Sequence, residues 1–476
     1  MQNMNTVDWK ILYTNYQGPE QRAVEFLVRE MGSWVLREPG VYAIHTMPCE
    51  PAVTIVGTTT NLVVTGRLQE NAILRRFIQP SEVPANGYLI RVLDNPDTTE
   101  KQLVLIAGDT PSAVLYGAID FIDIAVSEMT QELGNGLRFP NRTLREKLPP
   151  YDRASAPQTA TRSVFCWGHT VNNYREYIEN MARMKLNEVM FWNEFPPLNA
   201  QEVVDYAHSW GLKVVWGFSW GWSTGGCQDI TPENLAGLSD RIVEQWRNVW
   251  RPLDGDGIYF QSFTETQQET TNGVPIAESA VALVNETAEK IWRDAPGLRL
   301  IFGLHATSVR NKLEVIAQTH PDICILWEDC GGFPYLGHAM PNPVIDLAFT
   351  EELLAQNRRM GLVFKGQMMM EWQRFVHPTS PYVLGAASAQ TIENDARLVE
   401  PAWHHLKALW SQYGEEAYQI AAKAHASQNC EILNITGNLT GRVHWPTALA
   451  AQLLWDTSES YKELLARVFK LPYLQG

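Results

Sequence analysis

The chain has 476 residues, of which 45% are hydrophobic and 19% are charged, a composition typical of globular proteins with room for two or three sizeable cores. Its formal net charge of −15, without a Lys/Arg run, argues against nucleic acid or an anionic membrane surface as a partner. The six cysteines show no CxxC pair, which is typical of reduced thiols. We find no secretory signal and no transmembrane run, so we expect a cytoplasmic protein.

Residues 1–150 alternate strand and helix patterns, which predicts a small α+β sandwich domain. A helix should begin near GDTPSAVLYG, with Asp109 or Thr110 as N-cap and Pro111 in the first turn. The Pro-rich stretch KLPPYDRASAPQTA (147–160) predicts a linker. The predicted strands are WKILYT, AVTIVG, GYLIRVLD and QLVLIAG.

Residues 158–391 repeat a strand followed by a helix, which predicts a (β/α)8 TIM-type barrel. An open doubly wound sheet is the alternative, disfavoured because no G-x-G-x-x-G loop follows the first strand. Residues 392–476 predict a C-terminal helical region. The predicted strands are TRSVFCWG, NEVMFWN, KVVWGFSW, GIYFQSF, RLIFGLH, ICILW, GLVFKGQMMM and, as an eighth, YVLGAA (382–387).

Acids and tryptophans follow these strands at the end where a barrel places its active site. Each has a plain alternative: Glu194 could cap a helix, His305 could be a hydrogen-bonded core histidine, and Glu371 could pair with Arg374. However, four strand ends carry acids and five carry Trp, which solvated loops rarely hold. The 17 Trp of the chain are also numerous enough for a sugar-binding cleft, although most will fill the core.

Paired carboxylates among aromatic rings suit glycoside cleavage, in which one carboxylic acid protonates the leaving oxygen and a second activates water or attacks the sugar. Glu265, just past the strand at 257–263, is the candidate general acid. The sequence has no GxSxG elbow, HExxH helix or Walker loop. A metal-dependent isomerase or lyase would be the alternative, but the histidines are not spaced as ligands, so we expect no metal and no cofactor.

GYLIRVLD…QLVLIAGDTPSAVLYGAIDFID resembles the small domain that precedes the barrel in family 20 hexosaminidases and family 67 α-glucuronidases. YREYIENMARMKLNEVMFWN and VVDYAHSWGLKVVWGFSW resemble the first helices and strands of their barrels, so the resemblance covers residues 1 to about 375. Family 20 carries an adjacent Asp-Glu pair where this chain has Thr264-Glu265, a departure that counts against substrate-assisted chemistry. Family 67 carries a lone glutamate acid at that position.

The family 67 resemblance implies Glu265 as acid and Asp329, Glu328 or Glu371 as base. It also implies a uronate held by cationic side chains, and a homodimer through the C-terminal helices. We therefore expect an exo-acting glycoside hydrolase most like an α-glucuronidase. The alternatives are a β-N-acetylhexosaminidase-like enzyme and a carbohydrate-binding relative without catalysis. The expected substrate-binding residues are Trp167, His169, Trp192, Asn193, Trp220, Trp222, His305, Trp327, Lys365, Trp372 and Arg374.

Overall fold

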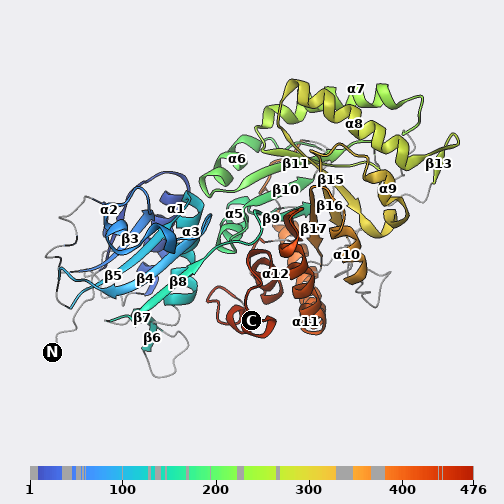
Figure 1. The fold of residues 1–476 in the computed structure, drawn as a ribbon. Helices are drawn as coiled ribbons and strands as arrows, with labels where there is room; N and C mark the ends of the chain where they lie inside the picture. Colours follow the sequence, from blue (N-terminus) through green and yellow to red (C-terminus); the bar gives the residue numbers. More distant parts are fainter. Residues whose placement is uncertain are drawn as a thin grey trace. The chain divides into compact units, whose positions relative to one another are not determined.

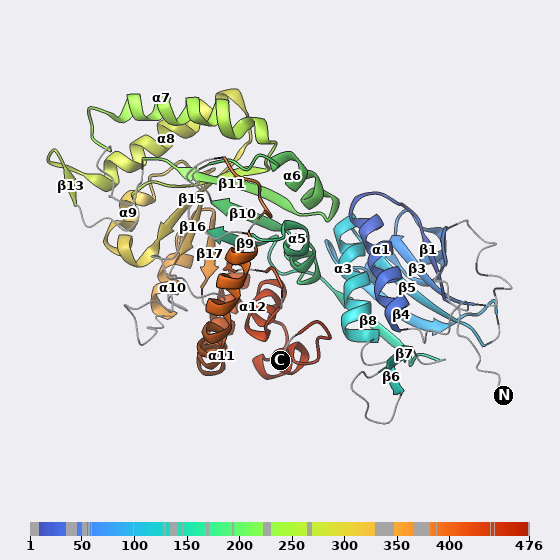
Figure 2. The same ribbon diagram turned by 180° about the vertical axis from the view of Figure 1, so that it is seen from behind.

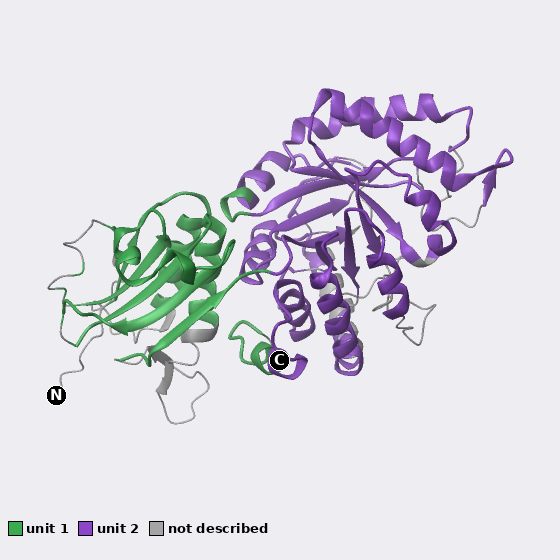
Figure 3. Cartoon of the chain, viewed as in Figure 1, with its two compact units in different colours: residues 1–157, 208–211, 466–474 green, residues 158–207, 212–465, 475–476 purple. Residues whose placement is uncertain are grey.

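The structure is a computed structural model of the 476-residue chain. It describes residues 9–34, 45–49, 55, 58, 60–98, 100–126, 130–133, 141–144, 147–167, 171–192, 195–221, 230–263, 269–328, 347–365, 381–386, 388–437, 439–441 and 443–474. The chain divides into two compact units, coloured separately in Figure 3. Unit 1 comprises residues 1–157, 208–211 and 466–474, and unit 2 comprises residues 158–207, 212–465 and 475–476. Within the described ranges, no helix has both the length and the apolarity that crossing a membrane requires.

Unit 1 is built on a six-stranded sheet with the order β2-β1-β3-β5-β4-β8. Strands β2, β1, β3 and β5 pair in parallel, whereas β4 is antiparallel to both β5 and β8. Helix α3 packs against α1 and against β5 (Figure 1). The bounds are β1 Trp9–Tyr13, β2 His45–Pro48, β3 Asn61–Arg67, β4 Tyr88–Asp94, β5 Gln102–Gly108, β8 Tyr151–Ser155, α1 Gly18–Trp34, α2 Ala72–Phe77 and α3 Pro111–Asp120; β6 Thr130–Leu133 and β7 Asn141–Leu144 form a separate hairpin.

Helix α3 begins where the sequence predicts. Thr110 is its N-cap, and its side chain accepts a hydrogen bond from the Ala113 backbone N–H at 3.2 Å, with Pro111 as the first helical residue. The predicted linker at 147–160, by contrast, contains β8, which pairs with β4 at the edge of the sheet. Its polar YDRAS sequence is typical of an edge strand. Because the stretch lacks an apolar run, the sequence predicts a linker there instead of a strand.

The centre of the sheet is a strand that the sequence analysis did not predict. NLVVTGR forms β3, which lies between β1 and β5 and is buried along nearly its whole length. The predicted strand AVTIVG lies outside the described residues except for Ile55.

Unit 2 is a closed barrel of eight parallel strands in the order β10-β11-β12-β15-β16-β17-β18-β9, with helices around it (Figures 1 and 2). The predicted (β/α)8 barrel is therefore confirmed, and the open doubly wound sheet is excluded. The strands are β9 Thr161–Trp167, β10 Glu188–Trp192, β11 Lys213–Ser219, β12 Gly257–Gln261, β15 Arg299–His305, β16 Cys324–Glu328, β17 Met360–Phe364 and β18 Cys430–Thr436. The main helices are α5 Tyr174–Arg183, α6 Ala200–Ser209, α7 Leu235–Gln245, α8 Ile276–Asp294, α9 Leu313–Ile316, α10 Leu347–Leu354, α11 Ala389–Ala426, α12 Trp445–Trp455 and α13 Tyr461–Val468.

The eighth barrel strand differs from the prediction. YVLGAA (382–387) is not a barrel strand; within it, Tyr382 forms one isolated bridge with Pro197. CEILNIT instead forms β18, which pairs with β17 on one side and with β9 on the other and so closes the barrel. The barrel therefore continues past residue 391, and the 38-residue helix α11 connects its last two strands. An apolar run flanked by two helical patterns carries no periodicity that marks it as a strand.

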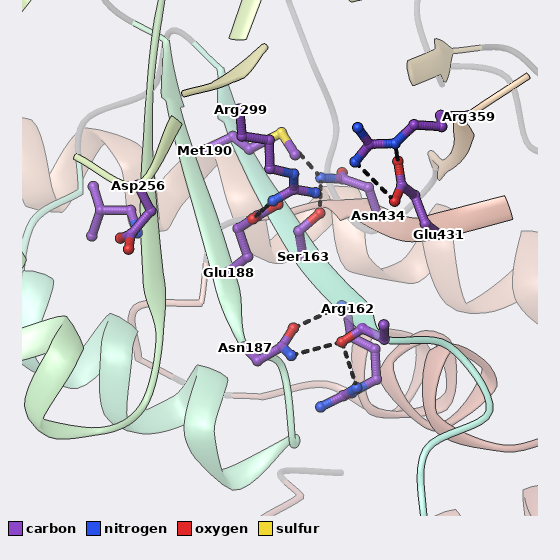
Figure 4. Close-up of polar contacts among 12 residues, drawn as sticks. Arg162, Ser163, Asn187, Glu188, Met190, Asp256, Arg299, Arg359, Glu431 and Asn434 are labelled. Carbon is purple, nitrogen blue, oxygen red and sulfur yellow. Dashed lines mark hydrogen bonds and ion pairs between the residues drawn. The ribbon is translucent and has the colours of Figure 1, made fainter. Parts of the chain in front are cut away.

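The two ends of the barrel interior are polar, and its middle is apolar. Alternate residues of each strand face inward, and the middle layer packs Phe165, Met190, Val215, Tyr259, Ile301, Leu326, Val363 and Ile432 with their neighbours. At the N-terminal end, Glu188 of β10 forms an ion pair with Arg299 of β15 (Figure 4). Two strands separate β10 from β15, so this pair crosses the barrel floor. Burial raises the pKa of Glu188, and the Arg299 guanidinium opposes that shift.

His425 of the long helix α11 contacts two residues outside that helix, Thr159 and Leu453. Its Nδ1 lies 2.7 Å from the Thr159 hydroxyl, and its Nε2 lies 2.8 Å from the Leu453 carbonyl oxygen. A neutral imidazole that accepts from the hydroxyl and donates to the carbonyl satisfies both contacts. Burial lowers the pKa of His425 from its usual 6.5.

Because the pKa of His425 is lower in the folded state, the unfolded chain binds the proton first as the pH falls. The His425 contribution to stability is thus complete above the unfolded-state pKa near 6.5 and decreases as the pH falls below it. Urea unfolding at about pH 7.5 and at about pH 5.5 gives the decrease in the free energy of unfolding between these two pH values. We expect this decrease to be about 1 kcal/mol smaller in His425→Gln than in the wild type. His404→Gln, at an exposed position of α11, is the control and should keep the wild-type pH dependence. An equal pH dependence in His425→Gln would contradict this account.

Candidate active site

The C-terminal end of the barrel interior holds five buried polar side chains that touch one another. Strand β12 supplies Tyr259 and Gln261, and β15 supplies His305. Strand β16 supplies Glu328, and Lys365 directly follows β17. We call these residues the Glu328 cluster. Each is at most 2% exposed.

Glu328 is the centre of this cluster because both of its carboxylate oxygens are engaged. Oε1 accepts hydrogen bonds from the Tyr259 hydroxyl at 2.8 Å and from Gln261 Nε2 at 2.9 Å. Oε2 lies 2.9 Å from Lys365 Nζ and 3.3 Å from His305 Nε2. Neighbouring strands thus direct four side chains to one carboxylate. Such a network fixes the position of each member more tightly than a single contact would.

Tyr259 reaches this carboxylate because β15 carries a glycine where its ring passes. A Cβ atom built on Gly303 would lie 1.8 Å from Tyr259 Oη and 2.3 Å from its Cζ. The ring also contacts Phe165 of β9, at 4.8 Å between centroids, and the edge of Trp192 of β10, at 5.6 Å. Tyr259 therefore connects both sides of the barrel through its middle.

The charges of the cluster are placed where water does not reach them. Glu328 and Lys365 are each 1% exposed, so their interaction is screened little by solvent or salt. Burying either charge alone would be costly, and removing one partner of such a pair typically costs ~3–5 kcal/mol. We conclude that Glu328 and Lys365 are retained as a pair, with His305 beside the same oxygen.

The structure brings together some of the predicted site residues. Glu328, His305 and Lys365 lie in one cluster, and Trp192 joins it through Tyr259. Trp167 ends β9 beside Trp192 in the strand register. The other predicted site residues at strand ends lie outside the described residues: Glu265, Asp329, Glu371, His169, Asn193, Trp222, Trp372 and Arg374.

Trp220 and Trp327 lie on the opposite face of the barrel wall. Trp327 alternates with the inward-facing Leu326 and Glu328, so its fully buried ring points outward. Trp220 stacks on the outward-facing Phe260, with ring centroids 3.6 Å apart and planes inclined by 8°. These two tryptophans therefore fill the layer outside the barrel and do not join the Glu328 cluster.

Two members of the cluster, Tyr259 and Gln261, have no role in the sequence-based site. Both face inward from β12, two residues apart, so strand alternation places them on one face but does not identify Glu328 as their partner. Within the described part of the chain, no three His, Cys, Asp or Glu side chains come together as metal ligands would.

A comparison with protein-family models gave no match, and a comparison with curated proteins gave none either. Solved structures are similar in fold. The protein CpGH84B aligns with a TM-score of 0.55 at 10% identity, over 97% of this chain and 70% of that chain. A GH138 enzyme targeting pectin rhamnogalacturonan II aligns with a TM-score of 0.50 at 11% identity, over 96% of this chain and 52% of its own.

The GH20 exo-β-N-acetylglucosaminidase from Vibrio harveyi, in complex with N-acetylglucosamine, aligns with a TM-score of 0.50. Its identity is 9%, over 98% of this chain and 73% of that chain. These alignments cover both units of the chain and show that it shares the barrel fold of glycoside hydrolases.

The space at Gly303 yields a direct test of the cluster. Gly303→Ala places a methyl group against Tyr259, so we expect a loss of ~1–3 kcal/mol in the free energy of unfolding. Gly237→Ala on α7 is the matched control, because the nearest atom to its new Cβ would be 3.6 Å away. That control should be neutral or more stable by ~0.5–1 kcal/mol. Equal stability of Gly303→Ala and the wild type in urea unfolding would rule out the described packing of Tyr259.

Proposed function

We propose that this protein is an exo-acting glycoside hydrolase, which removes a terminal sugar by carboxylate acid/base catalysis. The observation that carries the proposal is the Glu328 cluster. It is a buried carboxylate, fixed by four side chains, at the C-terminal end of a closed parallel barrel. Barrel enzymes build their active sites from the loops at this end. The fold likeness to glycoside hydrolases supports the reaction class without deciding it.

Glu265 is the general acid in this proposal. It follows Gln261, the last residue of β12, by four residues, and Gln261 is part of the cluster. Asp329 directly follows Glu328 and is our first choice as the base, with Glu371 as the alternative. An inverting mechanism would require about 6.5–9.5 Å between acid and base, and a retaining mechanism about 5–5.5 Å.

Glu328 itself is better suited to positioning than to proton transfer. A catalytic base needs an oxygen available to a water molecule or the sugar, but both oxygens of Glu328 already have partners within the cluster. We therefore assign it the role of holding Lys365, Tyr259 and Gln261 in place beneath the reacting groups.

The same contacts bear on the sugar. An α-glucuronidase needs cations to bind the uronate, and Lys365 was a candidate for that role. Its Nζ is already 2.9 Å from Glu328 Oε2, and His305 faces the same oxygen. These contacts favour a neutral terminal sugar, either a hexose or an N-acetylhexosamine. Among the structures of similar fold, the Vibrio harveyi enzyme is an exo-β-N-acetylglucosaminidase.

The test is a screen of 4-nitrophenyl hexosaminides, glucosides and galactosides, together with aldouronic oligosaccharides, against the wild type and Glu265→Gln. We expect turnover of a neutral glycoside and a drop of about 10²–10⁴-fold in kcat for Glu265→Gln, because the leaving oxygen loses its proton donor. Glu289→Gln, an exposed position on α8, is the matched control and should keep full activity.

Equal rates in the wild type and Glu265→Gln would refute the assignment of the acid. Turnover of aldouronic substrates alone would refute the preference for a neutral sugar. Sugar-dependent quenching of tryptophan fluorescence without any turnover would instead favour the carbohydrate-binding relative.

A further inference from the structure

Gln261 is the inward-facing member of the Glu328 cluster that ends β12, four residues before Glu265 in the sequence. It is fully buried, and its Nε2 lies 2.8 Å from Tyr259 Oη and 2.9 Å from Glu328 Oε1. These three atoms form a closed triangle, because the Tyr259 hydroxyl also donates to Glu328 Oε1 at 2.8 Å.

This triangle determines which way the amide of Gln261 is turned. The Tyr259 proton is directed to Glu328, so the phenol oxygen can accept a hydrogen bond from the amide nitrogen. The reversed amide would place its carbonyl oxygen against a carboxylate oxygen and a phenol oxygen, where electron pairs would repel one another. The nitrogen therefore faces Glu328, and the carbonyl oxygen Oε1 faces away from it.

The carbonyl oxygen Oε1 has no hydrogen-bond donor among the described residues, although it is fully buried. Buried acceptors in folded proteins almost always have a partner, and the exceptions call for an explanation. A fixed, dehydrated acceptor at the active end of a barrel is suited to a ligand donor.

We propose that Gln261 Oε1 is a sugar-binding group, which accepts a hydrogen bond from one hydroxyl of the bound terminal sugar. This inference rests on the proposed function and adds a specificity-determining residue to it. Glu328 and Tyr259 hold the amide in place, so the acceptor is fixed before the sugar binds. A sugar without that hydroxyl leaves the acceptor without a donor, and this is the way a buried polar group discriminates between ligands.

The experiment measures binding, so that it does not depend on the catalytic assignments. Each protein is titrated with sugars, and binding is followed by tryptophan fluorescence and by calorimetry. The sugars are glucose, galactose, N-acetylglucosamine and glucuronic acid, each with its monodeoxy analogues. The proteins are the wild type, Gln261→Met and Tyr259→Phe. Met has nearly the shape of Gln but no acceptor oxygen. Phe removes the hydroxyl of the triangle and keeps Gln261 Oε1.

We expect the wild type to lose about 10- to 100-fold in affinity when one particular hydroxyl of its sugar is absent. Gln261→Met should bind the parent sugar and that deoxy analogue equally, near the weaker affinity. Tyr259→Phe should unfold at lower denaturant concentration and still prefer the parent sugar. A purely structural role of Gln261 would lower stability without abolishing this preference.

Retention of the wild-type hydroxyl preference in Gln261→Met would overturn the inference, since a group other than Gln261 Oε1 would then recognise that hydroxyl. If a glycoside is turned over in a Glu265-dependent way at the same time, the proposed function stands and this inference alone fails. If the wild type neither binds these sugars nor turns over any glycoside, both fail together.

Discussion

The buried ion pair between Glu328 and Lys365 is the interaction on which the C-terminal end of the barrel interior depends. Two opposite charges sit there at 2.9 Å, each 1% exposed. Neither charge could remain without the other in such surroundings, so their strands must keep the register that brings them together. Because strand side chains alternate between faces, a slip of one residue would turn either charge out of the interior. The pair therefore fixes register as well as position.

The rest of the cluster follows from this constraint. Tyr259 and Gln261 satisfy the second carboxylate oxygen, and Tyr259 fits across the barrel only because residue 303 is glycine. At the opposite end, the buried Glu188 and the partly buried Arg299 form a second ion pair across the barrel. An apolar middle layer separates the two pairs. In the proposed hydrolase, these fixed side chains would support accurate placement of the reacting groups, on which proton transfer depends.

Much of the fold could be predicted from the sequence, because seven barrel strands are short apolar runs followed by helical patterns. The eighth strand, Cys430–Thr436, could not be predicted, because its short apolar run lies between two helical patterns and has no periodicity that distinguishes it from them. At the site, strand ends led to Glu328, Lys365 and His305, which contact one another in the structure, and to Trp192, which reaches them through Tyr259. Strand ends alone do not say which face a residue takes, so Trp220 and Trp327 were grouped with them. Tyr259 lies in mid-strand and carries no signal of its role until its neighbours across the barrel are known.

The most direct test of the Glu328–Lys365 constraint is a double-mutant cycle in urea unfolding, with Glu328→Gln, Lys365→Met and the double variant. Each single variant leaves one charge buried without its partner, so we expect each to lose ~3–5 kcal/mol. The double variant should lose about 1–3 kcal/mol less than the sum of the two, because neither charge remains. Additive losses, or single variants as stable as the wild type, would contradict the claim that this pair holds the C-terminal end of the barrel interior together.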